Sequence, residues 1–154
     1  MKALSIVLAV VAACLLALIA VFWFGGALEA EIAIAPAIAG DEALTAVEDV
    51  QNGLAVDVLT PIDETRDCAL TDITISFANG GLFDAEWLTC SLVPGAGDVA
   101  LYAQSDIKLD VAARSQAQLT LRVLTQGDGA GRALDVEYYV LGMRRTMTVP
   151  LELS

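Results

Sequence analysis

The sequence predicts an all-β fold, an antiparallel β-sandwich, placed behind one membrane-spanning α-helix. Two observations predict it: an uncharged, apolar run at residues 3–24, and a later series of short segments in which apolar and polar residues alternate. A period of two is typical of strands with one buried and one wet face, as antiparallel sandwiches require. We therefore expect two domains, a transmembrane helix within residues 1–26 and a β-sandwich over residues 27–154.

The run at residues 3–24 is predicted to be a transmembrane helix that serves as a signal anchor. Its length of about 33 Å, at 1.5 Å per residue, exceeds a bilayer core of about 30 Å. Lys2 precedes the run, whereas Glu29 and Glu31 follow it. Because positive charge stays on the cytoplasmic side, this pattern predicts a single-pass cell-membrane protein with its N-terminus in the cytoplasm and its C-terminal domain extracytoplasmic.

Phe22, Trp23 and Phe24 close the apolar run and are expected to form an aromatic belt at the membrane interface. Two cleavage alternatives stay open beside the retained anchor. Residues 27–30 fit the small-residue pattern of a secretory cleavage site poorly. Residues 11–14 resemble a bacterial lipobox, in which Cys14 would carry the lipid.

Strands are expected where the alternation is clearest, and turns where glycine, asparagine or proline interrupts it. The alternating segments are residues 28–34, 72–77, 88–92, 106–111, 118–123, 134–140 and 147–153. Asn52-Gly53 favours a hairpin between strands at 44–50 and 54–60, although residues 41–50 also fit a short helix. Residues 127–131 are interpreted as a glycine-rich hairpin turn. Pro150 predicts that the last strand lies at a sheet edge.

Composition limits the functions that the chain can perform. Twenty acidic and eight basic residues give a net charge of −12, which disfavours nucleic acid as a partner. The sequence contains no histidine, which excludes Ser-His-Asp and Cys-His catalysis and imidazole metal centres. We therefore expect no catalytic residue, no cofactor and no metal site. The acidic segment 57–72 is an oxygen-rich candidate for calcium, but we interpret it as a solvated loop.

Two groups of side chains are candidates for a structural or binding role. Cys68 and Cys90 are predicted to form a disulfide, which would close a loop of about 22 residues and stabilise the domain by about 3 kcal/mol. Two independent buried thiols are the alternative. Phe83, Trp87 and Tyr102 are predicted to form an exposed aromatic interface, since exposed aromatic residues often anchor protein contacts. The alternative is that Trp87 covers the open end of the sandwich.

Three segments resemble the immunoglobulin-like sandwiches of the LEA-2 and WHy type. They are Leu54 to Pro61, Leu70 to Phe77, and Ser115 to Val123. Thr60 stands where this group usually has an asparagine before the proline. The resemblance implies an immunoglobulin-like sandwich with a role in stress protection or surface interaction, and it carries no catalytic residues.

Together these patterns predict a non-enzymatic accessory or structural subunit of a membrane or cell-envelope assembly that acts through protein–protein contacts. The membrane itself and protein partners are the expected binding partners. A filament subunit of the pilin or archaellin type is one alternative, although the glycines at 25–26 and the strand that follows would interrupt its long helix. A ligand- or calcium-binding receptor module is the other.

Overall fold

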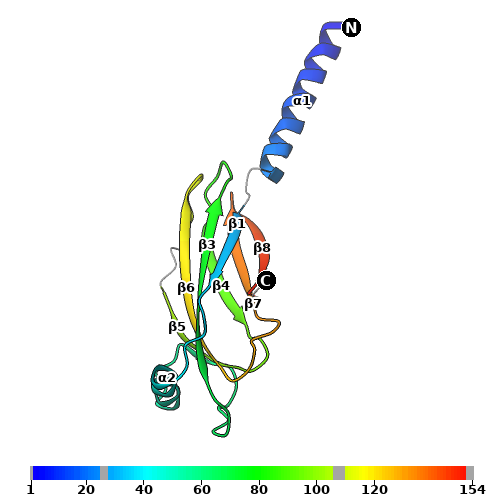
Figure 1. The fold of residues 1–154 in the computed structure, drawn as a ribbon. Helices are drawn as coiled ribbons and strands as arrows, with labels where there is room; N and C mark the ends of the chain where they lie inside the picture. The colour runs from blue at the N-terminus through cyan, green and yellow to red at the C-terminus, as the bar shows by residue number, and fades with distance from the viewer. Residues whose placement is uncertain (1, 25–27, 106–109, 152–154) are drawn as a thin grey trace.

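The computed structural model describes residues 2–24, 28–105 and 110–151 (Figure 1). Two helices and eight strands occur in this part of the chain. In chain order they are α1 (Lys2–Phe24), β1 (Leu28–Ile34), α2 (Asp41–Gln51), β2 (Asp57–Val58), β3 (Ala69–Asn79), β4 (Glu86–Val93), β5 (Asp98–Gln104), β6 (Gln116–Thr125), β7 (Ala133–Val140) and β8 (Met143–Pro150).

The strands form two antiparallel sheets, which confirms the predicted β-sandwich. One sheet has five strands in the order β1-β3-β6-β5-β2, and the other has three in the order β4-β7-β8. The chain changes sheets three times, between β3 and β4, between β4 and β5, and between β6 and β7. β8 lies at the edge of its sheet, as Pro150 predicted.

The core lies between the sheets and follows the predicted alternation. β3 and β6 pair over ten residues, and this register sets Ile73 opposite Leu121 and Ile75 opposite Leu119. These four side chains are at most 1% exposed. Burial of each such side chain stabilises the fold by roughly 2 kcal/mol relative to an exposed position. Inward residues of β7 and β8 complete the same cluster.

Residues 41–51 form helix α2 and not the expected strand at 44–50. Ala43, Ala46 and Val50 are buried at helical spacing, and the helix packs on the outer face of the five-stranded sheet. Asn52-Gly53 ends this helix and makes no hairpin: the Asn52 N–H donates to the Glu48 carbonyl, 2.9 Å away. Of the expected strand 54–60, only Asp57–Val58 forms a strand, β2, which pairs with β5. The flanking N–H groups of Val56 and Leu59 also donate to β5 carbonyls.

The prediction of a membrane span is corrected by the structure. Among the residues that the structure describes, no helix is long and apolar enough to cross a membrane. The transmembrane signal anchor, the cell-membrane localisation and the membrane as a partner are therefore withdrawn. The side chains of Phe22, Trp23 and Phe24 lie outside the described part.

The region between β4 and β6 also differs from expectation. The pattern at 106–111 predicted a strand, and residues 106–109 of it lie outside the described part. A strand that was not predicted, β5, lies earlier in the chain. Val111 is buried and forms an isolated bridge with Ala85. The run Val99-Ala100-Leu101 of β5 is buried on both faces, because α2 covers the outer one. It therefore lacks the alternation on which the expectation depended.

The predicted disulfide is absent. Cys68 and Cys90 are both free thiols. Cys68 packs on the cluster beneath α2, whereas Cys90 packs on the core between the sheets. Burial raises the pKa of the Cys90 thiol to about 11. The alternative of two independent, partly buried thiols describes this structure.

Candidate functional site

A β-bulge in β4 shapes the outer face of the three-stranded sheet. Glu86 pairs with Tyr139 and Thr89 pairs with Glu137, so β4 has one residue more than β7 across this interval. An extra residue of this kind locally bends a strand and re-aims a side chain. The re-aimed side chain here is Trp87, which is 68% exposed.

The backbone at Trp87 is held in an unfavourable conformation. Its φ angle is 51°, in the left-handed region that bulky residues rarely adopt. Such a residue costs about 1 kcal/mol or more and persists only where its surroundings impose it. Two neighbours impose it: Leu88 is fully buried in the core, and the Trp87 N–H donates to Asp110 Oδ1, 3.0 Å away. The strain therefore serves to present the indole ring to solvent.

Tyr139 and Arg144 lie beside Trp87 on the same face. The Trp87 and Tyr139 rings meet edge to face, with centroids 5.6 Å apart and planes inclined by 62°. The Tyr139 hydroxyl donates to Glu137 Oε1 at 3.2 Å, and Arg144 Nη2 donates to Glu137 Oε2 at 2.5 Å. The Arg144 guanidinium, more than the tyrosine, holds the pKa of Glu137 below its ordinary value.

Next to these residues the sheet face forms an open depression of about 460 Å³. Its polar lining consists of hydroxyl groups, two carboxylates and one guanidinium: Thr89, Ser91, Asp135, Glu137, Arg144, Thr146 and Thr148. The Thr148 hydroxyl donates to Asp135 Oδ1 at 2.7 Å. We call this depression together with Trp87 and Tyr139 the Trp87 face.

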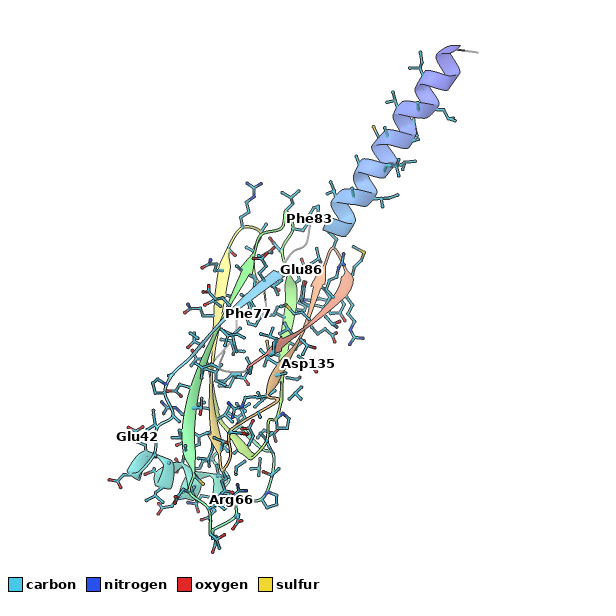
Figure 2. All side chains as sticks on the ribbon, turned by 45° about the vertical axis from the view of Figure 1, so that its right-hand side comes forward. Glu42, Arg66, Phe77, Phe83, Glu86 and Asp135 are labelled. Carbon is cyan, nitrogen blue, oxygen red and sulfur yellow. The ribbon has the colours of Figure 1, made fainter. Side chains whose placement is uncertain are left out.

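The structure does not bring the three predicted aromatic residues together. Phe83 is partly buried against the core between the sheets, near Glu86 at the end of the sandwich that faces α1 (Figure 2). Tyr102 belongs to the other sheet and packs beside α2, where its hydroxyl donates to Asp49 Oδ2 at 2.5 Å. Of the predicted set, Trp87 alone contributes to the Trp87 face. Sequence reasoning missed Tyr139, although the alternation in 134–140 already assigned it to the outward side.

The opposite end of the sandwich is fixed by two glycine-containing loops, residues 94–98 and 127–131, which we call the glycine junction. A methyl group at Gly95 would lie 2.2 Å from the Gly129 carbonyl oxygen, and one at Gly97 would lie 2.6 Å from Gly127 Cα. Two loops can approach this closely only where neither has a side chain. The sequence marked residues 127–131 as a turn but gave no sign of their partner loop.

A buried ion pair lies at the glycine junction. Arg132 Nε donates to Asp98 Oδ2 at 2.8 Å, and Arg132 Nη2 donates to Asp98 Oδ1. The Asp98 side chain is 0% exposed and that of Arg132 is 5% exposed. The Gly95 N–H also donates to Asp98 Oδ2, at 2.8 Å. This fork geometry, with an added donor, is the arrangement that a buried ion pair requires to be stable.

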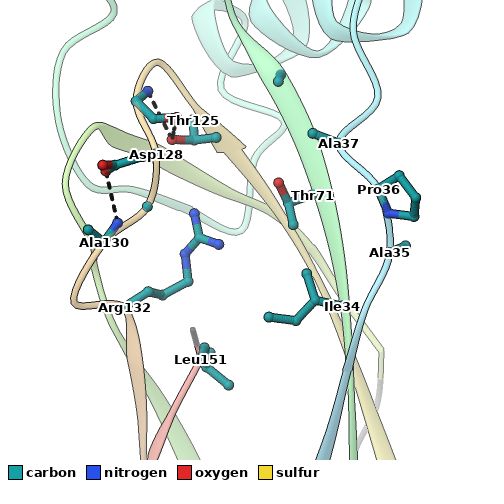
Figure 3. Close-up of a pocket in the computed structure, with 13 residues that line it drawn as sticks. Ile34, Ala35, Pro36, Ala37, Thr71, Thr125, Asp128, Ala130, Arg132 and Leu151 are labelled. Atoms are coloured by element: carbon teal, nitrogen blue, oxygen red, sulfur yellow. Dashed lines mark hydrogen bonds between the residues drawn. The ribbon is translucent and has the colours of Figure 1, made fainter. Parts of the chain in front are cut away.

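A cavity of about 630 Å³ opens beside the ion pair (Figure 3). The segment that follows β1 forms one wall, the β6–β7 loop forms the other, and Leu151 closes the floor. Its volume falls within the range of small-molecule sites, about 300–1,000 Å³. The sequence gave no indication of this cavity.

The acidic segment 57–72 does not converge on one point. Asp63 Oδ1 accepts hydrogen bonds from the Thr65 N–H and hydroxyl, and Asp72 forms a two-bond ion pair with Arg122, both bonds 2.6 Å. Within the described ranges, no group of three or more His, Cys, Asp or Glu residues is arranged to hold a metal ion. The calcium alternative therefore gains no support.

Comparisons with known proteins assign no family. No family model and no curated protein matches this chain. Among solved structures, the chain is similar to Northeast Structural Genomics Consortium target SoR45, at 9% identity and a TM-score of 0.43, over 81% of this chain and 82% of that chain. It is also similar to the GAE domain of GGA2p from Saccharomyces cerevisiae, at 11% identity and a TM-score of 0.37, over 64% of this chain and 97% of that one.

A third similar structure is a FixG-related protein from Vibrio parahaemolyticus, at 7% identity and a TM-score of 0.30, over 80% of this chain and 97% of that one. Likenesses of this size carry no functional assignment. None of these three structures is named as a LEA-2 or WHy protein, so that resemblance stays a prediction.

Proposed function

We propose that this protein is a non-enzymatic accessory subunit of a protein assembly, and that its β-sandwich binds a partner protein through the Trp87 face. The observation that carries the proposal is Trp87 itself: a large ring, 68% exposed, on a backbone with a φ of 51°. Strained backbone positions of this kind cluster at functional sites.

The composition of the Trp87 face fits a protein contact. Tryptophan, tyrosine and arginine are the residues that most often dominate interface energetics, and Trp87, Tyr139 and Arg144 lie together here. Tyr139 and Arg144 are already fixed by bonds to Glu137, so little side-chain entropy remains to be lost on binding. Hydroxyl groups around them provide a polar rim.

The charge of the face indicates the chemistry of the partner. Asp135 and Glu137 outnumber the single cation Arg144 in the depression, and the whole chain has a net charge of −12. A partner with a basic surface would be attracted, and a second copy of this acidic chain would be repelled. The absence of histidine from the sequence supports a role without catalysis.

The test compares two exposed apolar side chains on different surfaces. Trp87→Ala removes the proposed anchor, and Leu54→Ala removes a side chain of nearly equal exposure, 69%, beside β2 in the other sheet. The tagged full-length chain and both variants are purified from the source cells and their partners are quantified by mass spectrometry. We expect at least tenfold less of a stoichiometric partner with Trp87→Ala and no change with Leu54→Ala.

Three outcomes would contradict the proposal. One is equal recovery of every partner with Trp87→Ala and the wild type. Another is a homopolymer as the sole product, which would favour the filament alternative. The third is turnover of a generic esterase, phosphatase, glycosidase or peptidase substrate that one point substitution abolishes. Circular dichroism of both variants controls for loss of the fold.

A further inference from the structure

The cavity beside the ion pair has features that the Trp87 face does not explain. Its walls are mainly apolar, with Ile34, Pro36, Ala37 and Ala69 on the side of the five-stranded sheet and Leu151 opposite them. In Figure 3, Ile34, Pro36 and Ala37 lie on one side of an open space, with Thr71 beside it and Arg132 across from them. An apolar pocket with a few convergent polar groups is the usual form of a small-molecule site.

Thr71 is the first of these polar groups. It lies on the inward face of β3, two residues before Ile73, at the point where the core gives way to the cavity. The residue is 9% exposed, and its side chain lines the cavity.

Arg132 is the second polar group. Its Nε and Nη2 atoms donate to Asp98, and its guanidinium lies against Gly129, where a methyl group would be 2.5 Å from Nη2. The two bonds to Asp98 use Nε and Nη2, so Nη1 takes no part in the ion pair. Figure 3 shows the guanidinium reaching from the β6–β7 side into the space between the walls. The cavity therefore offers one strong donor and one hydroxyl.

From this arrangement we infer that the cavity binds a small, uncharged molecule with an apolar body and a carbonyl oxygen. The carbonyl accepts from Arg132 Nη1, the Thr71 hydroxyl bonds to the same polar group of the ligand, and the apolar body lies against the walls. An anion is disfavoured because Asp98 already balances the charge of Arg132, and because the carboxylate of Asp128 also lines the cavity. This site is separate from the protein contact proposed above.

The experiment uses two probes that differ in charge alone. Cyclohexanecarboxamide has a neutral carbonyl group on an apolar ring, and cyclohexanecarboxylate places an anion on the same ring. Each is titrated into the full-length, ¹⁵N-labelled chain while NMR follows the amide signals of Thr71, Gly129 and Arg132. We expect saturable shifts at these residues with the carboxamide, and at least fivefold weaker binding of the carboxylate.

Variants then test the assigned contact. Thr71→Val removes the hydroxyl at nearly constant volume, and Thr74→Val is its matched control on the outward face of the same strand. Thr71→Val should lower the affinity for the carboxamide at least fivefold while its melting temperature stays equal or rises. Thr74→Val should leave the affinity unchanged.

The inference is overturned if the carboxamide produces no saturable shift at these residues, since water alone would then satisfy both groups. It is also overturned if the carboxylate binds as tightly as the carboxamide, or if Thr71→Val and Thr74→Val bind the carboxamide alike. None of these results bears on Trp87, so the two proposals fail separately.

Discussion

The two ends of strand β4 use opposite physical solutions. At its start, the bulge at Trp87 holds a strained backbone and an exposed ring. At its finish, Gly95 enters the glycine junction, where the buried Asp98–Arg132 pair is fully enclosed. The start of β4 exposes an apolar ring to water, whereas the loop after β4 borders a charged pair that is buried from water.

This difference separates side chains that are needed to hold the fold from those that are not. The residues at the glycine junction have partners whose loss would leave a buried charge or a backbone clash. The residues of the Trp87 face have partners that solvent can replace. A substitution at the junction should therefore unfold the protein, whereas a substitution on the face should alter what the protein binds. Four predictions test this contrast.

The largest effect is expected from breaking the buried ion pair. Arg132→Met leaves the Asp98 carboxylate without its counterion in a side chain that is 0% exposed, and it should lower the free energy of unfolding by about 3–5 kcal/mol. Urea denaturation measures the change. The matched control is Arg144→Met, whose arginine side chain is 64% exposed and should leave the unfolding midpoint unchanged. Equal losses in both variants would remove the distinction between the two ends.

A smaller loss is expected from a single methyl group at the glycine junction. Gly95→Ala places Cβ 2.2 Å from the Gly129 carbonyl oxygen, so one of the two loops must move. Overpacking against backbone costs roughly 3 kcal/mol. Gly142→Ala in the β7–β8 turn is the control, because its φ of 75° imposes strain while nothing lies within 4 Å of the added atom. Thermal melts should show the larger loss at Gly95, and the reverse order would show that space does not limit the junction.

The third prediction concerns the titration of Glu137 on the Trp87 face. The Arg144 bond lowers its folded-state pKa, so the interaction is complete above the unfolded pKa of about 4.3 and is lost as pH falls through the folded value. Carboxyl NMR should give a Glu137 midpoint below 4.3. Arg144→Met should raise that midpoint, and Tyr139→Phe should raise it less. A midpoint that stays the same in Arg144→Met would show that the pair does not persist in solution.

The smallest effect on stability is expected at Trp87. Trp87→Asn removes the edge-to-face contact with Tyr139, worth about 1 kcal/mol, but asparagine tolerates a φ of 51° better than tryptophan does. The two changes oppose each other, so the free energy of unfolding should stay within about 1 kcal/mol of the wild type. A loss of more than about 3 kcal/mol in the free energy of unfolding, measured by urea denaturation, would show that Trp87 is needed for the fold. That result would contradict the contrast between the two ends of β4.

The sequence predicts the sandwich well where each strand has one wet face. Strands β1, β3, β6 and β7 alternate clearly because their outward residues meet water. β5 escapes prediction because α2 covers part of its outer face, so Val99, Ala100 and Leu101 are all buried. Helix α2 was predicted as a strand because Asn52-Gly53 was interpreted as a hairpin turn. The same pair also occurs at the ends of helices, as it does here.

Of the candidate site, the sequence reveals Trp87 through its phase relative to Leu88, but not the neighbours that give it a context. Tyr139 and Arg144 join it through the β4–β7 and β7–β8 registers, which alternation alone does not set. Asp98 and Arg132 are 34 positions apart, and neither stands in a motif. The length and hydropathy of residues 3–24 predicted a membrane span. That prediction was wrong for the described part of the chain, in which no helix meets the requirement for a span.

Two of the three chain crossings between the sheets, from β4 to β5 and from β6 to β7, pass through the glycine junction. Because the junction joins segments of both sheets, we predict that it closes late in folding, after the strands have paired. Contacts that form after the transition state govern the lifetime of the folded chain and have little effect on the rate at which it folds. Weakening the Asp98–Arg132 pair should therefore raise the unfolding rate and leave the refolding arm of the chevron almost unchanged. The glycine junction then sets how long the chain stays folded.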